Sequence, residues 1–284
     1  MTHSIYPCLW FEKNAKAAFE WYCSIFPNSH LIEENQYAVK AQLAGIRFLA
    51  INDEPTFHPN PSISFMVICE NRTEVDCYWN QLIEGGSAQM ALGQYAWSDY
   101  YGWLQDQYGF SWQLYLGKLS DTNQQKIVPT LMYCGAYQGQ CLAALNFYQS
   151  LFHHFRTQGI LKYSEGEYAG QIKHAQVISN HFTLMAMDSG VPQPFEFNEA
   201  VSLIIECENQ TEIDYYWNSI TLKGTESQCS WCKDQFGVSW QIHPENLSEI
   251  LRQNPRAQAA VFKMMNKLRF LKNSINDKSE YNNE

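Results

Sequence analysis

The chain has 284 residues, 15% of them aromatic, and its 19 Lys and Arg against 29 Asp and Glu give a net charge of −10. This charge argues against a general nucleic-acid binder, because contact with a phosphate backbone needs clustered cations. No stretch reaches the roughly 18 to 20 apolar residues of a membrane span, and the first residues lack the pattern of a signal peptide. We therefore expect a cytoplasmic protein without a nucleic-acid or membrane partner, long enough for two domains.

The first predicted module begins with an apolar strand at residues 5–11 and continues with a helix. The helix is indicated by apolar residues spaced three and four apart, which share one face: Ala15, Phe19, Tyr22 and Phe26. Two strands are predicted next, at residues 36–43 and 47–52, joined by a tight turn.

The second predicted module begins with an apolar strand at residues 63–69. A helix follows, with Thr73 as its expected N-cap and one apolar face made of Val75, Tyr78, Trp79 and Leu82. Two final strands carry the residues around Trp112 and Gln113.

The same order of elements returns in the second half of the chain. Residues 69–80 return as residues 207–218 with nine of twelve positions identical, 138 residues later. Residues 103–113 return only 128 residues later, so the first copy holds ten extra residues, around positions 87–100. Such a repeat predicts two tandem domains, each of two βαβββ modules. We place the domains at residues 1–118 and 127–246, a C-terminal helical segment at 247–271 and a flexible tail at 272–284.

Cys229 and Cys232 form a Cys-x-x-Cys pair that could suggest redox or metal chemistry. The corresponding residues of the first copy are Tyr101 and Leu104, which are ordinary packing residues. Neither further ligands at zinc spacing nor the strand-to-helix context of a thioredoxin-like pair accompanies them. We therefore interpret the pair as structural.

Three blocks of sequence carry a resemblance to a known family: residues 7–29, 195–220 and 232–244. They resemble the PhnB-like (3-demethylubiquinone 3-methyltransferase-like) branch of the vicinal oxygen chelate superfamily, which has the glyoxalase and bleomycin-resistance fold. The resemblance implies an α+β fold of two tandem domains, in which paired βαβββ modules form a curled mixed sheet around a cavity. It leaves open whether modules pair within one copy, between copies or between chains.

The resemblance also allows a test for metal chemistry, since enzymes of the superfamily hold a divalent metal at four strand positions. By resemblance, these positions fall near Pro7 and Pro129, Ala50 and Ala186, Ser62, Ser64, Ala200 and Ser202, and Gln113 and Gln241. Of these residues, only the glutamines could ligate well, and one neutral amide cannot hold a divalent ion against water. We expect neither a metal nor another cofactor.

Methyl transfer from S-adenosylmethionine would need a nucleotide-binding crevice, normally in a parallel α/β sheet with a glycine-rich first loop. No such segment occurs in the sequence.

The remaining candidate site is a cavity lined by alternate strand residues, because side chains two apart on a strand share one face. The residues expected to bind a ligand there are Trp10, Gln42, Gln113, Tyr115, Tyr133, His174, Gln176, Gln241 and His243. Aromatic walls with a few amides suit a planar or moderately apolar small molecule. Alternatively, the same aromatic residues simply fill the sheets.

Three hypotheses for function follow. The leading one is metal-independent binding of a small organic molecule in one or both cavities, with or without turnover. The second is a metal-dependent enzyme of lyase or dioxygenase type with a single active copy, built from His174, Gln176, Gln241 and His243. The third is an interaction module whose C-terminal helices mediate a homodimer. The sequence identifies neither a catalytic residue nor the ligand.

Overall fold

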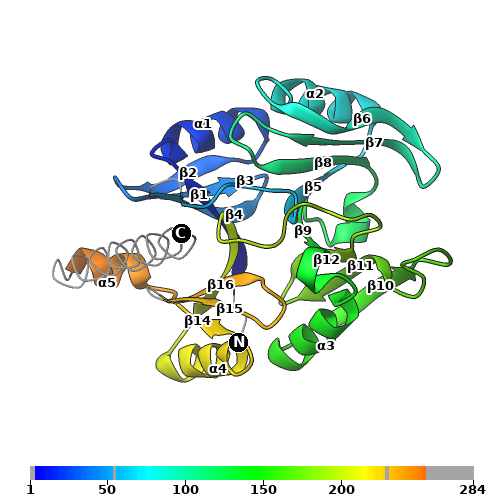
Figure 1. Cartoon of the computed structure of the whole chain (residues 1–284). Helices are drawn as coiled ribbons and strands as arrows, with labels where there is room; N and C mark the ends of the chain where they lie inside the picture. Colours follow the sequence, from blue (N-terminus) through cyan, green and yellow to red (C-terminus); the bar gives the residue numbers. More distant parts are fainter. Residues whose placement is uncertain (1–3, 54–55, 228–229, 254–284) are drawn as a thin grey trace, which may run out of the picture.

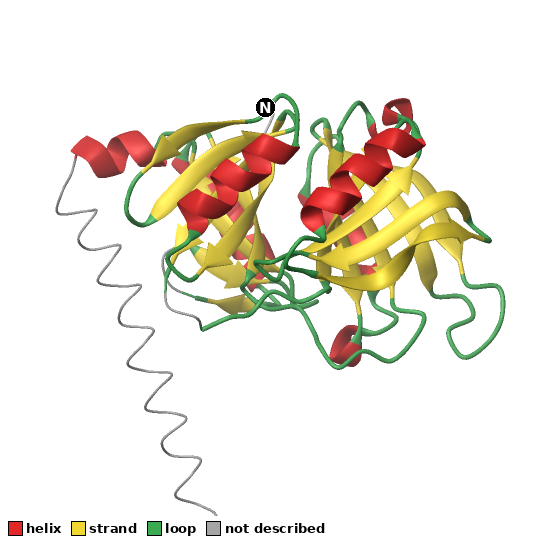
Figure 2. Cartoon of the chain, turned by 90° about the horizontal axis from the view of Figure 1, so that it is seen from above, coloured by secondary structure: helices red, strands yellow, loops and turns green. Residues whose placement is uncertain are grey.

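The computed structural model describes residues 4–53, 56–227 and 230–253 (Figures 1 and 2). The predicted tail and most of the predicted C-terminal helical segment lie outside these residues; the described part of that segment is helix α5 (Leu247–Gln253). None of the helices in the described ranges is long and apolar enough to span a membrane.

The chain forms four βαβββ modules in sequence. Module 1 contains β1 (Ile5–Phe11), α1 (Ala15–Ile25), β2 (His30–Glu34), β3 (Ala38–Leu43) and β4 (Ile46–Asn52). Module 2 contains β5 (Ile63–Cys69), α2 (Arg72–Leu82), β6 (Ser87–Tyr95), β7 (Ser98–Gln105) and β8 (Ser111–Leu116). Module 3 contains β9 (Ile127–Tyr133), α3 (Cys141–Leu151), β10 (Arg156–Lys162), β11 (Ile172–Ser179) and β12 (Phe182–Asp188). Module 4 contains β13 (Val201–Cys207), α4 (Gln210–Thr221), β14 (Thr225–Glu226), β15 (Trp231–Lys233) and β16 (Ser239–Pro244).

The modules pair between the two copies of the repeat. The first sheet joins modules 4 and 1 in the order β14-β15-β16-β13-β1-β4-β3-β2, and the second joins modules 3 and 2 in the order β10-β11-β12-β9-β5-β8-β7-β6. The contacts that join the modules are the antiparallel pairs β1 with β13 and β5 with β9. Residues 1–118 and 127–246 are therefore repeats of sequence, and each contributes one module to each sheet. The expected α+β fold with two mixed sheets is confirmed.

The helices cover one face of each sheet, and the main apolar core lies between that face and the helices (Figure 1). In β1, for example, Leu9 and Phe11 join this core with Phe19 of α1, whereas Tyr6 and Cys8 point to the opposite face. We call the opposite face the helix-free face. Alternation along each strand thus divides the side chains between a shared core and two separate helix-free faces.

Two buried aspartates, Asp106 and Asp234, connect the sheets. Asp106 lies within residues 103–113, and Asp234 is its counterpart in the second copy of that segment. The Tyr22 hydroxyl of module 1 donates to Asp106 of module 2 at 2.5 Å, and the Trp112 indole donates to the same carboxylate at 2.7 Å. Asp234 receives the equivalent bonds from Tyr148 at 2.7 Å and from Trp240 at 2.9 Å. Burial raises the pKa of Asp106 to about 6. This repeated motif therefore serves the scaffold.

The N-caps of α2 and α4 differ from the sequence prediction. Asn71 and Asn209, rather than Thr73 and its counterpart, accept from the backbone N–H of Glu74 and Glu212. The Glu74 carboxylate in turn accepts from the backbone N–H of Glu70 at 3.0 Å. This reciprocal arrangement satisfies N–H groups that a helix start leaves free, so the helix begins earlier than the threonine suggested.

Candidate functional site

The helix-free face of the second sheet carries a group of neutral polar side chains at its centre. The Gln113 amide donates to the Ser64 hydroxyl at 2.7 Å and accepts from the Tyr101 hydroxyl at 2.7 Å. Thr130 lies directly opposite Ser64 across the β5–β9 pair and so shares this face. We call Ser64, Tyr101, Gln113 and Thr130 the Thr130 cluster. Its members are buried, and the Thr130 hydroxyl has no hydrogen-bond partner among the described residues.

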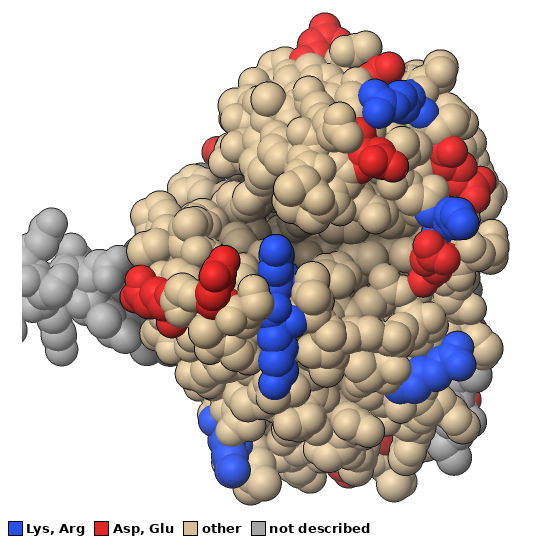
Figure 3. All heavy atoms as spheres, turned by 90° about the vertical axis from the view of Figure 1, so that its right-hand side faces the viewer, with Lys and Arg blue, Asp and Glu red and all other residues tan. Residues whose placement is uncertain are grey.

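Apolar side chains surround the Thr130 cluster on the same face. They are Met66, Ile68, Val128 and Met185, with Tyr115 and Leu119 packed against them. The second sheet curls so that its two margins, β6 and β10, lie on the same side of the molecule, at the right in Figure 1. Figure 3 shows that side: the surface is hollowed between its upper and lower parts, and uncharged residues line most of the hollow.

The helix-free face of the first sheet has a related centre with different chemistry beside it. Ser202 lies opposite Cys8 across the β1–β13 pair, as Ser64 lies opposite Thr130, and the Gln241 amide donates to Ser202 at 2.9 Å. Burial raises the pKa of the Cys8 thiol to about 12, although hydrogen bonds with Gln241 and Ser202 act in the opposite direction. The thiol is therefore protonated at neutral pH.

A charged network adjoins this centre in the first sheet. The Glu206 carboxylate accepts from the Tyr6 hydroxyl at 2.6 Å and the Lys40 ammonium at 3.1 Å, and it forms a short ion pair with Arg47. Burial alone would raise the pKa of Glu206, but the Tyr6 hydrogen bond and the two cations lower it below its usual value. We call these four residues and His243, which pairs with Glu206 across β13 and β16, the Glu206 cluster.

His243 is buried within this network. Desolvation lowers its pKa to about 4, the nearby Glu206 acts to raise it, and Lys40 acts to lower it further. The imidazole is therefore neutral near pH 7, and the fixed charges of the Glu206 cluster are those of Lys40, Arg47 and Glu206. Each of these three is already paired within the cluster.

The structure places the predicted ligand residues on two separate faces. Gln113 and Tyr115 lie in β8 on the helix-free face of the second sheet, as expected from their spacing. His174 and Gln176 lie in β11 of the same sheet; desolvation lowers the pKa of His174, and the Gln176 amide donates to Gln158 and to the backbone carbonyl of Asp121. Gln241 and His243 belong to the first sheet.

This separation corrects the second hypothesis for function. Gln241 and His243 of β16 and His174 and Gln176 of β11 lie in different sheets, because modules 3 and 4 do not pair with each other. One active copy containing all four side chains is therefore not formed.

Three other predicted residues have different surroundings. Tyr133 belongs to the main core, where its hydroxyl lies 3.2 Å from that of Tyr148, so it does not line a helix-free face. Trp10 does lie on the helix-free face of the first sheet, packed edge-on against Trp231. The Gln42 amide donates to Asn28 and is held there. Val128 and Thr130 of β9 face the helix-free side, so Tyr133, an odd number of positions further along the same strand, faces the core instead.

Sequence reasoning missed the residues that distinguish the two faces. Glu206 is the one charged residue of the buried strand β13, whose counterpart in the first copy has Ile68, and this charge was the available signal. Cys8 and Thr130 were missed because the position facing the expected cavity was placed one residue early on the first strand of each copy. Pro7 and Pro129 pair with Leu203 and Phe65, which belong to the main core. Ala50 and Ala186 also lie in that core.

The donors at the two centres do not fit a divalent metal. The second sheet offers two hydroxyls and an amide, and the first offers a protonated thiol, a hydroxyl and an amide. Protein sites for these ions rely on carboxylate, imidazole or thiolate ligands, which amide and carbonyl oxygens only supplement. Glu206 and His243 are nearby, but Lys40 and Arg47 occupy the Glu206 carboxylate. Within residues 4–53, 56–227 and 230–253, no three His, Cys, Asp or Glu side chains form a group that could hold a metal ion.

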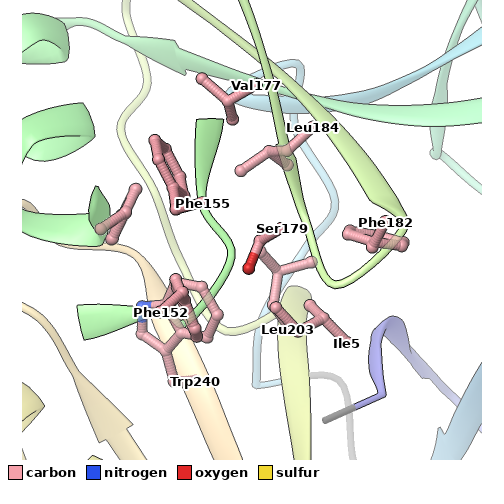
Figure 4. Close-up of a pocket in the computed structure, with 10 residues that line it drawn as sticks. Ile5, Phe152, Phe155, Val177, Ser179, Phe182, Leu184, Leu203 and Trp240 are labelled. Carbon is pink, nitrogen blue, oxygen red and sulfur yellow. The ribbon is translucent and has the colours of Figure 1, made fainter. Parts of the chain in front are cut away.

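A further small pocket lies at the seam between the sheets (Figure 4). Ile5, Leu203 and Trp240 of the first sheet contribute to it, together with Phe152, Phe155, Val177, Ser179, Phe182 and Leu184 of module 3. Its lining is almost wholly apolar, and it is on the core side of both sheets. It contains no group of converging polar side chains, so the helix-free faces are the better candidates.

Comparison with known proteins agrees with this architecture. The model of the family described as 3-demethylubiquinone-9 3-methyltransferase matches twice, over residues 3–115 and 125–243. The chain belongs to this family. The two matches span both copies of the repeat, so each copy by itself has the family's pattern. No curated protein matches the chain.

Solved structures resemble one copy or the whole chain. A PhnB protein from Bacillus cereus is 33% identical, with coverage of 39% of this chain and 98% of that chain and a TM-score of 0.37. Protein PA1353 from Pseudomonas aeruginosa is 21% identical, with 38% and 92% coverage and a TM-score of 0.34. Glyoxalase I from Zea mays is 9% identical, with 88% and 95% coverage and a TM-score of 0.54, which shows a shared fold.

Proposed function

We propose that this chain binds a neutral small organic molecule on the helix-free face of the second sheet, without a metal ion. The ligand carries a carbonyl or hydroxyl oxygen that pairs with Thr130, and its apolar part lies against Met66, Met185 and Tyr115. Binding sites for small molecules are typically apolar with a few converging polar groups, which is the composition of this face.

The observation that carries the proposal is the Thr130 hydroxyl. Thr130 is 2% exposed, and its hydroxyl has no partner in the described structure. A buried hydroxyl without a hydrogen bond costs about 1 to 3 kcal/mol. A ligand oxygen beside Ser64 and Gln113 would remove that cost by forming a hydrogen bond with Thr130. The site therefore favours a ligand that carries such an oxygen over a purely apolar one.

The first sheet is less suited to the same ligand. The polar groups of its Glu206 cluster already satisfy one another, and a ligand would have to displace an ion pair. Among the described residues the first sheet also has an unpartnered buried hydroxyl, that of Ser239, which lies at the beginning of β16 opposite Lys233 and two residues before Gln241.

The methyl transfer in the family's description is not part of this proposal. The two sheets are mixed, with helices on one face only, and they lack the parallel order of a doubly wound nucleotide-binding sheet.

The proposal is tested with acetophenone, a neutral aromatic ketone, in a saturation-transfer NMR titration of the full chain. We expect saturable binding that is unchanged by a metal chelator. Benzoate, which has the same ring with an anionic group, should bind more weakly because the Thr130 cluster provides no cation. Absence of saturable acetophenone binding, or binding that requires an added divalent ion, would contradict the proposal.

The Thr130→Val variant tests the role of the hydroxyl. Valine keeps the side chain's volume but removes the oxygen, so acetophenone affinity should fall about fivefold, the equivalent of about 1 kcal/mol. The free energy of unfolding should stay equal or rise, since an unpartnered polar group has been removed. A loss of stability with unchanged affinity would mean that Thr130 has only a structural role.

A further inference from the structure

The hairpin formed by β6 and β7 is much longer than its counterpart in the second copy of the repeat. β6 has 9 residues and β7 has 8, whereas the corresponding strands β14 and β15 have 2 and 3. The extra residues identified from the sequence repeat fall within this hairpin. The hairpin lies at one margin of the second sheet (Figure 1), on the side where the surface is hollowed (Figure 3).

Three aromatic side chains form a contiguous group on this hairpin. The rings of Trp97 and Tyr101 meet edge to face with centroids 4.6 Å apart, and the rings of Tyr95 and Trp97 are stacked at 5.6 Å. Tyr95 also contacts Tyr101 at 5.8 Å. We call Tyr95, Trp97 and Tyr101 the aromatic rim.

The aromatic rim reaches from the centre of the face to the solvent. Tyr101 is 3% exposed, pairs with Tyr115 of β8 and donates its hydroxyl to Gln113 of the Thr130 cluster. Trp97, at the other end, is 50% exposed. A half-exposed tryptophan leaves a large apolar surface in water. Because the Trp97 ring contacts Tyr101, that surface lies on the same side of the sheet as the candidate site.

We infer that the aromatic rim makes the site selective for planar aromatic ligands over saturated ligands of the same size. This inference rests on the proposed function and goes beyond it by naming the ligand class and Trp97 as the residue that selects it. A flat ring extending from an oxygen at Thr130 can stack against the rim, whereas a puckered ring cannot make an equivalent face-to-face or edge-to-face contact. In the first sheet, the short strand β15 instead carries the buried Trp231, which packs against Trp10.

The test compares two ketones that differ only in the ring: acetophenone and 1-cyclohexylethanone. The wild-type chain should bind acetophenone more tightly. In the Trp97→Ala variant, acetophenone affinity should fall about fivefold, whereas affinity for 1-cyclohexylethanone should change less than twofold. The variant should fold normally because Trp97 is half exposed. Tyr215→Ala, at an exposed tyrosine on α4, is the matched control and should change neither affinity.

The outcomes separate this inference from the proposed function. Equal losses for both ketones in Trp97→Ala would show a rim that is merely apolar, and no loss for either would show a rim that does not touch the ligand. Either result overturns the inference while leaving binding at the Thr130 cluster intact. If the wild-type chain binds neither ketone, the proposed function fails and the inference fails with it.

Discussion

The two sheets share one architecture but differ in the side chains that surround the polar centre of their helix-free faces. At the centre of each face lies a serine bonded to a glutamine, Ser64 with Gln113 or Ser202 with Gln241. In the first sheet the neighbouring Glu206 cluster is internally paired, whereas in the second sheet methionines and Ile68 occupy the surroundings and the Thr130 hydroxyl has no partner among the described residues. The comparison teaches that duplication preserved the scaffold while the faces diverged toward a structural network and a candidate binding surface.

The largest expected effect comes from replacing Glu206 with its counterpart in the second sheet. Glu206→Ile leaves Lys40, Arg47 and Tyr6 without their acceptor in a largely buried position, and the free energy of unfolding should fall by about 3 kcal/mol. Urea denaturation measures the change. The expected value is at the lower end for a buried pair because Arg47 is 39% exposed.

Neutralising the two cations as well provides the control for this variant. Adding Lys40→Met and Arg47→Met to Glu206→Ile should restore at least half of the lost stability, since apolar groups of similar size can replace a buried ion pair. Wild-type stability in the single variant would show that the Glu206 cluster does not hold the first sheet together.

A pH dependence should separate the sheets next. The folded pKa of His243 is lowered to about 4 from 6.5. Because the unfolded chain binds the proton more readily, the stability contributed by neutral His243 is present above about pH 6.5 and is lost as the pH falls toward 4. As the pH falls across this interval, the unfolding free energy of the wild-type chain should therefore decrease by about 2 to 3 kcal/mol more than that of His243→Gln.

Tyr115→Gln is the matched change in the second sheet, because Tyr115 occupies the position of His243. The stability difference between this variant and the wild-type chain should stay constant over the same pH interval. A difference that stays constant for His243→Gln too would refute the burial of a neutral imidazole in the first sheet.

Much of the fold could be predicted from the sequence because the repeat marks its units and alternation marks its central strands. Residues 5–11 and 63–69 were predicted as strands with the bounds that the structure shows. The edge strands β2 and β10 carried no such signal, since every residue of β10 and most of β2 is exposed and neither has an apolar face. Pairing between copies was also beyond the sequence, because equivalent modules present nearly the same edges.

The candidate site could be predicted only in part. Gln113 was found from its position beside Tyr115 on a late strand, but Thr130 was missed through an alignment shift of one residue. In a strand such a shift moves a side chain to the opposite face, so it exchanges a core residue for one facing the ligand. The aromatic rim was missed because the extra residues were recognised as an insertion, and sequence spacing alone did not show where the hairpin would place Trp97.

A matched pair of variants tests most directly whether the second sheet, and not the first, binds the ligand. Gln113→Leu and Gln241→Leu occupy equivalent positions, and each leaves a buried serine without its amide partner. Gln113→Leu also removes the acceptor of the Tyr101 hydroxyl, so the free energy of unfolding of both variants is measured beside their affinity. We predict that acetophenone affinity, measured by saturation-transfer titration, falls about tenfold in Gln113→Leu and changes less than twofold in Gln241→Leu. Equal losses in both variants, or a loss confined to Gln241→Leu, would contradict the claim.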